Sequence, residues 1–452
     1  SVSRGLGDVY KRQMLKTLVG AFKNKDIRKK ILYTLMILVI VRVGSLLPIP
    51  GVDTEYFSSL LSGINTGDLS YLSAFTGGSF ERMSLFALSI TPYITSSIIM
   101  QLLAIAIPKL EEMQKEGEDG RKKIAAITRY VTIALALIES IAMAVGFGRS
   151  GLIKGYQGFS TLHYIVSIIV VVAALTAGSA MLMWLGERIT ENGVGNGISI
   201  VLLINIISGM PSDFATLYST FVAPRTIAKG VLAAAIIIAI LVVMVVLVCF
   251  LQDGERRIPV QYSQKVSGRK TFGGQSTNIP LKVNTAGVMP VIFASSLMQF
   301  PVIIAQLFGK SYEWTRYLSS SYWCRISAPK YSIGLILYIV LLIIFAYFYT
   351  SITFNPIEVA DNLKKAGGVI PGITPGKSTS DYLNNILNYI VFVGAVGLLI
   401  IALIPIMCTG FFNASVSFGG TSVIIIVGVV LETLKQIESQ MVNRYYKGFL
   451  SE

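Results

Sequence analysis

The sequence predicts an all-α polytopic membrane protein with ten transmembrane helices. Hydrophobic residues make up 53% of its 452 residues and charged residues only 14%, whereas an ordinary soluble domain has about 25% charged residues. The mean hydropathy is +0.67. Ten segments are apolar over roughly the 20 residues that a helix needs to cross a bilayer. So few charges would not cover the surface of a soluble protein, so we expect the chain to lie in a membrane.

The ten apolar segments are spread along the whole chain, and two of them are shorter than the others. In chain order they are residues 31–47, 83–107, 124–147, 162–185, 198–210, 230–251, 286–307, 333–352, 386–406 and 421–434. The fifth and the tenth are marginal in length for a bilayer crossing. The count of ten therefore depends on these two segments.

The basic residues between these segments predict the orientation of the chain. There are 38 Lys and Arg against 24 Asp and Glu, a net charge of +14. With the N-terminus inside, the inner loops carry about three times as many Lys and Arg as the outer loops, as the positive-inside rule requires. Both termini are therefore expected in the cytoplasm. Residues 1–13 precede Met14, and we interpret them as a non-native extension; leaving them out does not change this result.

Ten helices divide into two groups of five, which predicts two halves of opposite orientation. The N-terminal half covers residues 14–211, an external hinge loop covers 212–229, and the C-terminal half covers 230–452. The two short segments stand fifth in each half. Short spans at matching places indicate an inverted repeat with a pathway between the halves. The alternative is that both are buried helices that need not cross the bilayer fully.

The sequence contains no arrangement of residues that is typical of an enzyme: there are no paired carboxylates, no nucleotide-binding loop and no Ser–His–Asp set. The only histidine is His163, which excludes zinc sites built on two histidines. Of the few ionisable residues inside apolar segments, we interpret Arg42 as interfacial or paired with a loop carboxylate, and Glu139 as a helix–helix contact; Glu432 lies near the end of the tenth segment. The sequence predicts no enzyme, no metal site and no cofactor.

Residues 68–80 form a short apolar stretch that is interrupted by Gly77 and Gly78 and lies directly before the second span. The stretch is too short to cross a bilayer. One interpretation is a re-entrant half-helix, which membranes tolerate only where it packs in protein or faces a cavity. The other interpretation is a helix on the outer surface.

Two cytoplasmic loops are long and basic. The loop over residues 252–282 contains an alternation at 257–262 that predicts a β-hairpin, and the second loop covers residues 355–385. Charged and aromatic residues on structured loops are suited to docking a large partner. The alternative is that these charges serve only to orient the chain.

Eight ordered motifs resemble the SecY family, the central subunit of the bacterial protein-translocation channel, and the resemblance covers essentially the whole chain from Met14. The motifs are RVGSLLPIPGVD at 42–53, ITPYITSSIIMQLL at 90–103, KEGEDGRKKI at 115–124, ERITENGVGNGISI at 187–200, ERRIPVQY at 255–262, NTAGVMPVIFASS at 284–296, NPIEVADNLKKAGGVIPGI at 355–373 and FGGTSVII at 418–425.

The resemblance implies a clamshell of two inverted five-helix halves around a central pore. The second and third spans, facing the seventh and eighth, would form a lateral gate through which signal sequences and membrane helices leave into lipid. A ring of apolar side chains would line the constriction, namely Ile90, Ile94, Leu202, Ile292 and Ile425. A plug over about 68–80 would fill the outer funnel and would include Leu69, Tyr71, Leu72, Phe75, Gly77 and Gly78.

The resemblance also implies partners and a location. The partners are the SecE and SecG subunits, the ATPase SecA, the ribosome, membrane lipid and polypeptides that carry signal sequences, with no small-molecule substrate. The location is the bacterial cytoplasmic membrane. Docking of SecA and the ribosome would use Arg256, Arg257, Lys364, Lys365 and Lys377.

The chain departs from the family pattern at Thr374. The family commonly reads PGIRPG where this chain reads PGITPG. The resemblance associates that arginine with coupling to SecA. Its role is therefore either lost in this chain or taken by a neighbouring lysine, for which Lys364, Lys365 and Lys377 are the candidates.

Two functions fit this architecture, a protein-conducting channel and a secondary transporter with an inverted repeat. A transporter needs polar or charged ligands near the bilayer midplane, whereas the five ring positions are apolar. A narrow apolar constriction gates by dewetting and can close around any chain without reading its sequence. We therefore expect a channel for unfolded secretory proteins that also releases membrane helices into lipid. The chain has no ATPase motif, so a partner or an ion gradient must supply the energy.

Overall fold

The computed structural model of the protein describes residues 22–63, 76–147, 161–223, 227–262, 265–267, 270–272, 276–307, 313–319, 322–324, 329–412 and 420–448. These residues are predominantly helical and belong to two compact units. The first unit comprises Ser1–Thr216, Ile303–Ser311 and Val429–Glu452. The second comprises Leu217–Val302 and Tyr312–Gly428.

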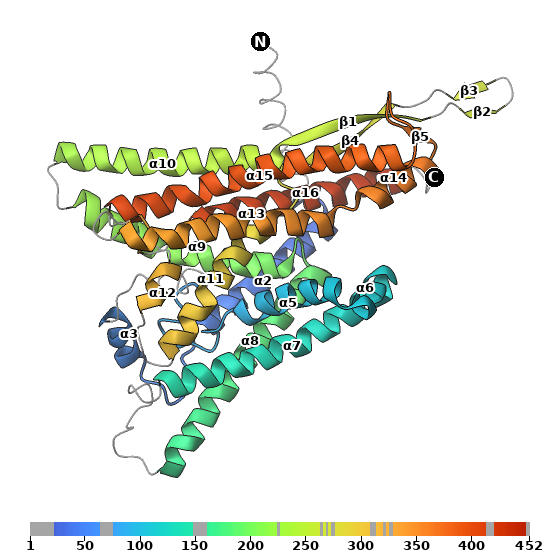
Figure 1. Ribbon diagram of the computed structural model, residues 1–452. Helices are drawn as coiled ribbons and strands as arrows, with labels where there is room; N and C mark the ends of the chain where they lie inside the picture. The colour runs from blue at the N-terminus through green and yellow to red at the C-terminus, as the bar shows by residue number, and fades with distance from the viewer. Residues whose placement is uncertain are drawn as a thin grey trace. The chain divides into compact units, whose positions relative to one another are not determined.

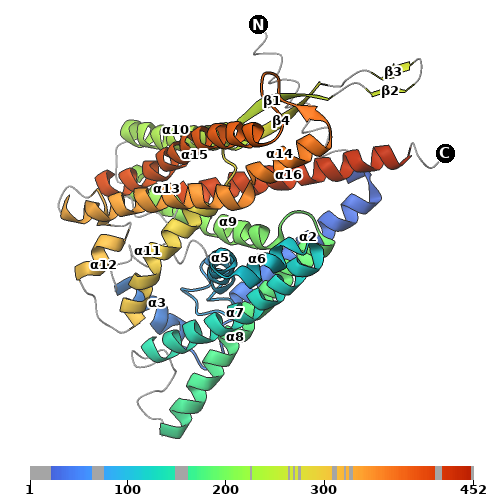
Figure 2. The ribbon, with the colours of Figure 1, turned by 45° about the vertical axis from the view of Figure 1, so that its right-hand side comes forward.

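The first unit is built around two long helices, α7 (Glu118–Phe147) and α8 (Thr161–Asn192), which pack against each other (Figure 1). Helix α5 (Thr91–Ala106) packs on α7, and α2 (Lys25–Leu46) packs on α8. The unit also contains α3 (Thr54–Gly63), α6 (Pro108–Lys115), α9 (Gly197–Leu217) and the C-terminal part of α16 (Gly420–Gly448). Figure 2 shows α6 beside α7.

The apolar core of the first unit includes four residues of segment 76–90, which consists mainly of turns directly before α5: Phe80, Met83, Ala87 and Leu88. The ring of Phe57 packs edge-on against Phe80, with 5.9 Å between ring centroids. Met83 is fully buried in the same cluster and has a φ of +42°, and Ser89 has a φ of +53°. Such backbone angles cost energy for residues other than glycine. The core therefore holds a strained segment in front of α5.

Residues 193–197 turn the chain between α8 and α9 in very little space. The side chain of Asn196 accepts a hydrogen bond from the first turn of α9 at 3.2 Å. A Cβ placed on Gly197 would collide with the carbonyl oxygen of Gly186. The hydroxyl oxygen of Thr34 on α2 accepts a hydrogen bond from the backbone of this turn at 3.2 Å. This part of the ERITENGVGNGISI motif thus joins three helices by close packing.

The helical part of the second unit is centred on α15 (Lys377–Phe412). It packs against α10 (Ile227–Asp253), α13 (Ile333–Thr353) and α14 (Pro356–Lys365). Figures 1 and 2 show α10, α13 and α15 running along one another. The remaining helical elements of the unit are η3 (Tyr218–Val222), α11 (Met289–Leu307) up to Val302, α12 (Glu313–Leu318), η5 (Pro329–Ser332) and the first turns of α16.

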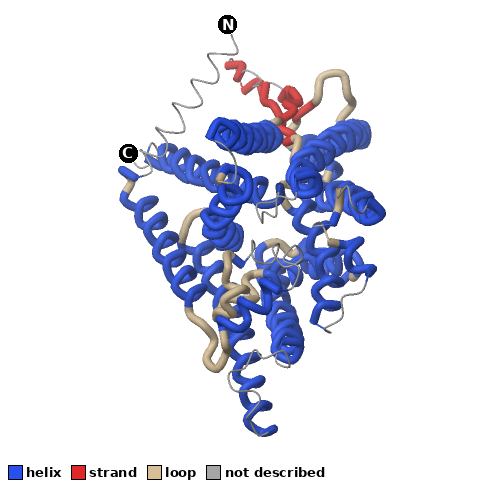
Figure 3. The backbone as a smooth tube through the Cα atoms, turned by 90° about the vertical axis from the view of Figure 1, so that its left-hand side faces the viewer, coloured by secondary structure: helices blue, strands red, loops and turns tan. Residues whose placement is uncertain are grey.

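A three-stranded antiparallel sheet joins the two long loops of the second unit. β1 (Glu255–Tyr262) pairs with β4 (Ser276–Lys282) and, at its end, with β5 (Gly368–Val369). Between β1 and β4, the short strands β2 (Lys265–Ser267) and β3 (Lys270–Phe272) pair with each other and extend away from the sheet (Figure 1). Figure 3 shows the strands, in red, gathered in one place.

The sheet rests on an apolar cluster of its own. Ile258 and Val260 of β1 are buried between exposed neighbours. They pack with Leu281 of β4, Leu363 of α14 and Leu383 of α15. The strand alternation predicted from the sequence is therefore confirmed. The cluster makes the sheet, α14 and the start of α15 one packed block.

All ten segments predicted to cross the membrane overlap a helix, but fewer helices are long and apolar enough to do so. Among the described residues six qualify, namely Lys122–Phe147, Leu162–Asn192, Gly197–Val222, Lys229–Asp253, Pro329–Lys365 and Lys377–Cys408. The pair Thr91–Ala104 and Pro108–Gln114, bent by 104°, gives a seventh if it is counted as one span. The chain is thus a multi-pass membrane protein, and the count of ten is not confirmed.

The remaining predicted spans fall short for local reasons. Helix α2 begins with a basic run and also carries Arg42. Helix α5 begins only at Thr91, because the residues before it form turns instead of the helix that their apolar character suggested. Of α11, only Met289–Met298 counts as an apolar helix among the residues that the structure describes, and the second half of α16 is charged. Each feature reduces the length of uninterrupted apolar helix.

The fifth and tenth helices are longer than the sequence predicted. Helix α9 runs through Pro211 and continues as η3 to Val222, and α10 starts at Ile227. Most of the predicted loop 212–229 is therefore helical. The apolar run ends near Pro211, but polar residues leave the backbone hydrogen bonds of a helix intact. Helix α16 has 29 residues. Shortness of these two helices is therefore not an argument for an inverted repeat.

Candidate functional site

Three of the five predicted ring positions lie in the first unit. Ile90 stands at the N-cap of α5 and is 1% exposed. The N–H of Ile94 donates to the carbonyl of Ile90 at 3.0 Å, so these two side chains follow each other on one face of the helix. Leu202 lies on α9 and is buried.

The other two ring positions, Ile292 on α11 and Ile425 on α16, lie in the second unit and are also buried. Each directly follows a residue of the unit's main apolar cluster, Val291 and Ile424 respectively, but neither is itself a member of that cluster. Adjacent side chains on a helix point about 100° apart. These helices therefore bury two faces, and the predicted ring positions lie on the face outside the main cluster.

The predicted plug is described only at its C-terminal end. Leu69, Tyr71, Leu72 and Phe75 lie outside the described residues. Gly77 and Gly78 have φ angles of +61° and +78°, a region that glycine enters without strain. The backbone of Gly77 lies directly against α9, because a Cβ there would be 2.7 Å from the carbonyl oxygen of Asn205.

Sequence reasoning missed the buried polar residues that surround this segment. Asn205 of α9 donates from Nδ2 to Ser89 Oγ at 3.1 Å, and Ser179 Oγ of α8 donates to the carbonyl of Ser89 at 3.4 Å. All three side chains are almost completely buried. An asparagine inside an apolar segment is the signal that could have revealed this contact.

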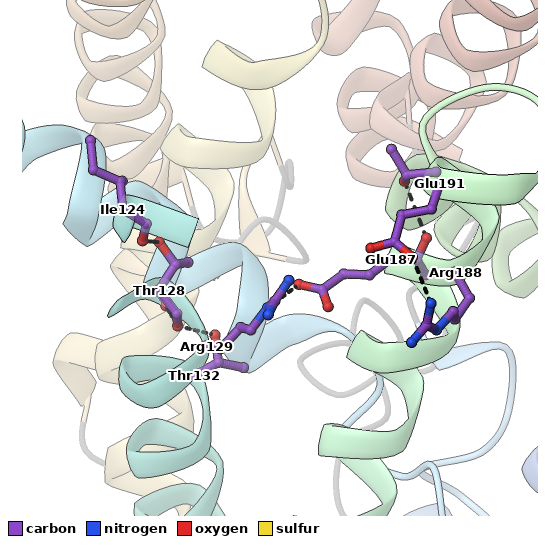
Figure 4. A network of polar contacts seen from close by, with 10 residues as sticks. Ile124, Thr128, Arg129, Thr132, Glu187, Arg188 and Glu191 are labelled. Atoms are coloured by element: carbon purple, nitrogen blue, oxygen red, sulfur yellow. Dashed lines mark hydrogen bonds and ion pairs between the residues drawn. The ribbon is translucent and has the colours of Figure 1, made fainter. Parts of the chain in front are cut away.

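A second polar network lies between α7 and α8 (Figure 4). Arg129 of α7 donates from Nε to Glu187 Oε1 of α8 at 2.7 Å. Next to it, Ser96 Oγ of α5 donates to the carbonyl of Thr128 at 2.8 Å. Glu187 opens the ERITENGVGNGISI motif, so one residue of that motif fixes the separation of two membrane helices.

The five predicted docking cations all lie on the packed block of sheet, α14 and α15. Arg256 is exposed on β1, whereas the guanidinium of Arg257 is paired with the carboxylate of Glu255 at 2.6 Å. Lys364 and Lys365 are exposed in the last turn of α14, where a cation is favoured by the helix dipole. Lys377 is exposed at the start of α15.

The position that departs from the family pattern lies on the same block. Thr374 is exposed between Gly372 and Gly376, which both have positive φ angles. Its carbonyl accepts a hydrogen bond from Thr379 Oγ1 at 2.9 Å. The hydrogen bond that the structure gives for Thr374 is therefore made by its backbone and not by its side chain.

No chemical centre accompanies these features within the described part of the chain. No three His, Cys, Asp or Glu side chains gather there in a way that could hold a metal ion. Arg42 has a buried Nη1 without a hydrogen-bond partner among the described residues. The arrangement offers apolar surfaces, hydrogen bonds and a basic block, which suit conduction and docking of polypeptides.

Comparison with known proteins agrees with this picture. The family model of SecY matches residues 84–434. The protein translocase subunit SecY of Streptomyces galbus is 44% identical over 446 residues, covering 97% of this chain and all of the relative. That of Halalkalibacterium halodurans is 42% identical over 445 residues, with the same coverage.

Solved structures share the fold at lower identity. One described as the structure of a protein conducting channel has a TM-score of 0.60 at 18% identity, covering 92% of this chain and 93% of that chain. The Sec61 chain of a canine ribosome-channel complex has a TM-score of 0.56 at 17% identity, with the same coverage. The chain belongs to the SecY family of protein translocase subunits, and its function is that of a protein-conducting channel and not of an enzyme.

Proposed function

We propose that the chain forms two inverted five-helix halves around a pore in the bacterial cytoplasmic membrane, with both termini in the cytoplasm. The excess of Lys and Arg in the loops taken as inner supports this orientation. Unfolded secretory proteins pass through the pore, and membrane helices leave sideways between the second and third spans of one half and the seventh and eighth of the other.

The constriction of the pore is the ring of Ile90, Ile94, Leu202, Ile292 and Ile425. The observation that carries this assignment is that all five are apolar and four of them are at most 6% exposed. An ion entering such a ring loses its hydration without receiving other ligands, which is very costly. The closed ring is therefore dry, and an open ring fits any extended polypeptide.

The plug covers about residues 68–80 and closes the outer side of this constriction. Gly77 and Gly78, with their positive φ angles, form its C-terminal hinge. A glycine hinge lets the backbone change direction with little steric cost. Because segment 76–90 leads directly into Ile90, movement of the plug and of the ring are mechanically linked.

The basic block of the second unit binds cytoplasmic partners. Arg256, Lys364, Lys365 and Lys377 are exposed on one rigid body, which suits acidic surfaces of SecA and of the ribosome. The guanidinium of Arg257 is paired with the carboxylate of Glu255, so Arg257 binds an acidic surface only after it has left Glu255. SecE and SecG complete the complex within the membrane.

Site-specific photo-cross-linking tests the pore directly. A photo-reactive amino acid is introduced at Ile94 or Ile292, and a secretory polypeptide is stalled in the complex by a folded domain at its C-terminus. The matched control is Ile238 on α10, a helix outside the proposed gate, and its side chain is 61% exposed. We expect adducts to the stalled chain from the two ring positions and not from the control. Equal adducts at all three positions would reject the ring assignment.

A further inference from the structure

Gly77 lies against a polar part of α9 and against Arg42 of α2. A Cβ placed on Gly77 would be 2.5 Å from Ser208 Oγ, 2.7 Å from the carbonyl oxygen of Asn205 and 3.1 Å from Arg42 Nη1. Ser208 Oγ lies 3.5 Å from the carbonyl oxygen of Gly77 itself. Only a residue without a side chain fits there. The backbone of segment 76–90 is therefore seated directly on α9.

The other end of the same segment meets the same helix. The side chain of Asn205 donates to Ser89 Oγ at 3.1 Å, and Ser179 of α8 donates to the carbonyl of Ser89 at 3.4 Å. Ser89 has a φ of +53°, which a serine keeps only when its surroundings hold it. Asn205 thus contacts segment 76–90 twice, through its backbone at Gly77 and through its side chain at Ser89.

Two polar atoms of residues at this place, Arg42 Nη1 and Asn205 Oδ1, are buried and have no hydrogen-bond partner among the described residues, and the same holds for Ser79 Oγ within segment 76–90. Buried polar atoms of native proteins are generally paired, often through an ordered water. Arg42 Nη1 and Ser208 Oγ both lie close to the point that a Cβ of Gly77 would occupy, so their separation is no more than the sum of the two distances given above. One bridging water spans such a separation.

We propose that Arg42, Ser89, Ser179, Asn205 and Ser208 form a polar socket, here called the α9 socket, that latches segment 76–90 in the closed channel, with Asn205 as its positioning residue. This inference rests on the proposed plug function of that segment. In a dry interior the hydrogen bonds of the socket are strong. Once the pore is wet, water competes for each of them, so the latch weakens as soon as opening begins.

Thiol accessibility measures the latch without relying on transport. The reporter is Ser79→Cys, because Ser79 is only 1% exposed, in a full-length chain whose three cysteines, Cys249, Cys324 and Cys408, are replaced by alanine. The complex is treated with a membrane-impermeant maleimide in the absence of substrate. The latch variants are Asn205→Leu and, as a smaller change, Ser208→Ala.

The matched control is Ser140→Ala. Ser140 is fully buried in the same unit, and its hydroxyl forms a hydrogen bond of 3.0 Å with Thr176 between α7 and α8. The two hydrogen bonds that the structure gives for Ser140 Oγ go to the carbonyl of Ala136 and to Thr176, and both partners lie outside segment 76–90. A general loosening of the unit is expected to affect the control as much as the latch variants.

We expect Asn205→Leu to accelerate modification of the reporter about tenfold. Loss of one buried hydrogen bond shifts the equilibrium constant of local opening by about that factor. Ser208→Ala should accelerate it less, and Ser140→Ala should leave it unchanged. If neither latch variant exceeds Ser140→Ala, the α9 socket is wrong.

Ion conductance of the same complexes in planar bilayers separates this inference from the plug proposal. If modification is accelerated and resting conductance rises with it, both the α9 socket and the plug proposal stand. If modification is accelerated and conductance stays at the parental level, the socket holds the segment but the segment is not the seal. In that case the plug proposal fails and the latch alone remains.

Discussion

Arg129 of α7 and Glu187 of α8 form an ion pair with 2.7 Å between Nε and Oε1. The pair joins a helix of the proposed lateral gate to the helix that leads into the tight turn at 193–197. Its side chains are 47% and 22% exposed, so water and salt screen the attraction. The ion pair therefore contributes more to holding the two helices at a defined separation than to the free energy of unfolding.

A double-mutant cycle on this pair should give a small but measurable coupling. Neutralising Arg129 and Glu187 singly and together, each to Gln, should yield a coupling energy of about 0.5 kcal/mol in the unfolding of the purified complex. Raising the salt concentration should reduce it. The control is the exposed pair Arg188 and Glu191 within α8, which does not join two helices. A coupling of zero at low salt would show that the contact does not hold the helices.

Two glycines of α9 should respond in opposite ways to alanine. Gly197→Ala places a methyl group against the carbonyl of Gly186, so it should destabilise the protein by about 2 kcal/mol through overpacking. Gly209→Ala has open space within 4 Å, so it should be neutral or stabilise by up to about 1 kcal/mol through helix propensity. Thermal unfolding of the two variants compares them. Equal unfolding temperatures would contradict the close helix packing at the 193–197 turn.

Charge reversal on the basic block should impair docking. We expect Arg256→Glu to weaken SecA binding and SecA-dependent transport in vesicles more than Arg257→Glu, because Arg257 is already paired with Glu255. Lys282→Glu is the control, since Lys282 is an exposed cation on the neighbouring strand β4. Membrane insertion of all three variants should be normal. Unchanged SecA-dependent transport in Arg256→Glu at physiological salt would refute the docking role.

Restoring the family arginine at Thr374 should change transport little. The side chain of Thr374 is exposed, and the turn uses only its carbonyl, so Thr374→Arg should fold normally. Lys377 lies three residues further along the chain and is also exposed, so we expect it to supply the cation. Transport rates of parent and variant in vesicles with SecA provide the comparison. A several-fold gain in rate would mean that no lysine has replaced the arginine.

The sequence predicted the positions of the helices well, because apolar runs determine what is buried in a membrane. It predicted the β1 strand as well, since Ile258 and Val260 alternate with exposed residues. It misplaced the start of α5 and the end of α9. An apolar run cannot distinguish turns packed in a core, as at 76–90, from a helix, and Pro211 does not end a helix whose remaining hydrogen bonds are intact.

The candidate site could be predicted only in part. Its apolar positions were found through motif resemblance, which assigns residues but not contacts. Asn205 and Ser89 were missed because their partners are far apart in sequence and meet only through the fold. The pairing of Arg257 with Glu255 was also missed, although the predicted strand could have revealed it, because residues two apart on a strand lie on the same face.

The central claim, that a dry apolar ring seals the channel, is tested most directly by resting ion conductance of purified complexes in planar bilayers. Ile292→Asn and Ile425→Asn add a polar group to the ring, and Val291→Asn and Ile424→Asn add the same group one residue earlier, in the apolar cluster. We predict that the ring variants fold, conduct ions at rest and export proteins with defective signal sequences, because a polar ring wets more easily. The cluster variants should lose stability without a rise in conductance per folded complex. Parental conductance in both ring variants, in complexes that are normally folded, would contradict the account.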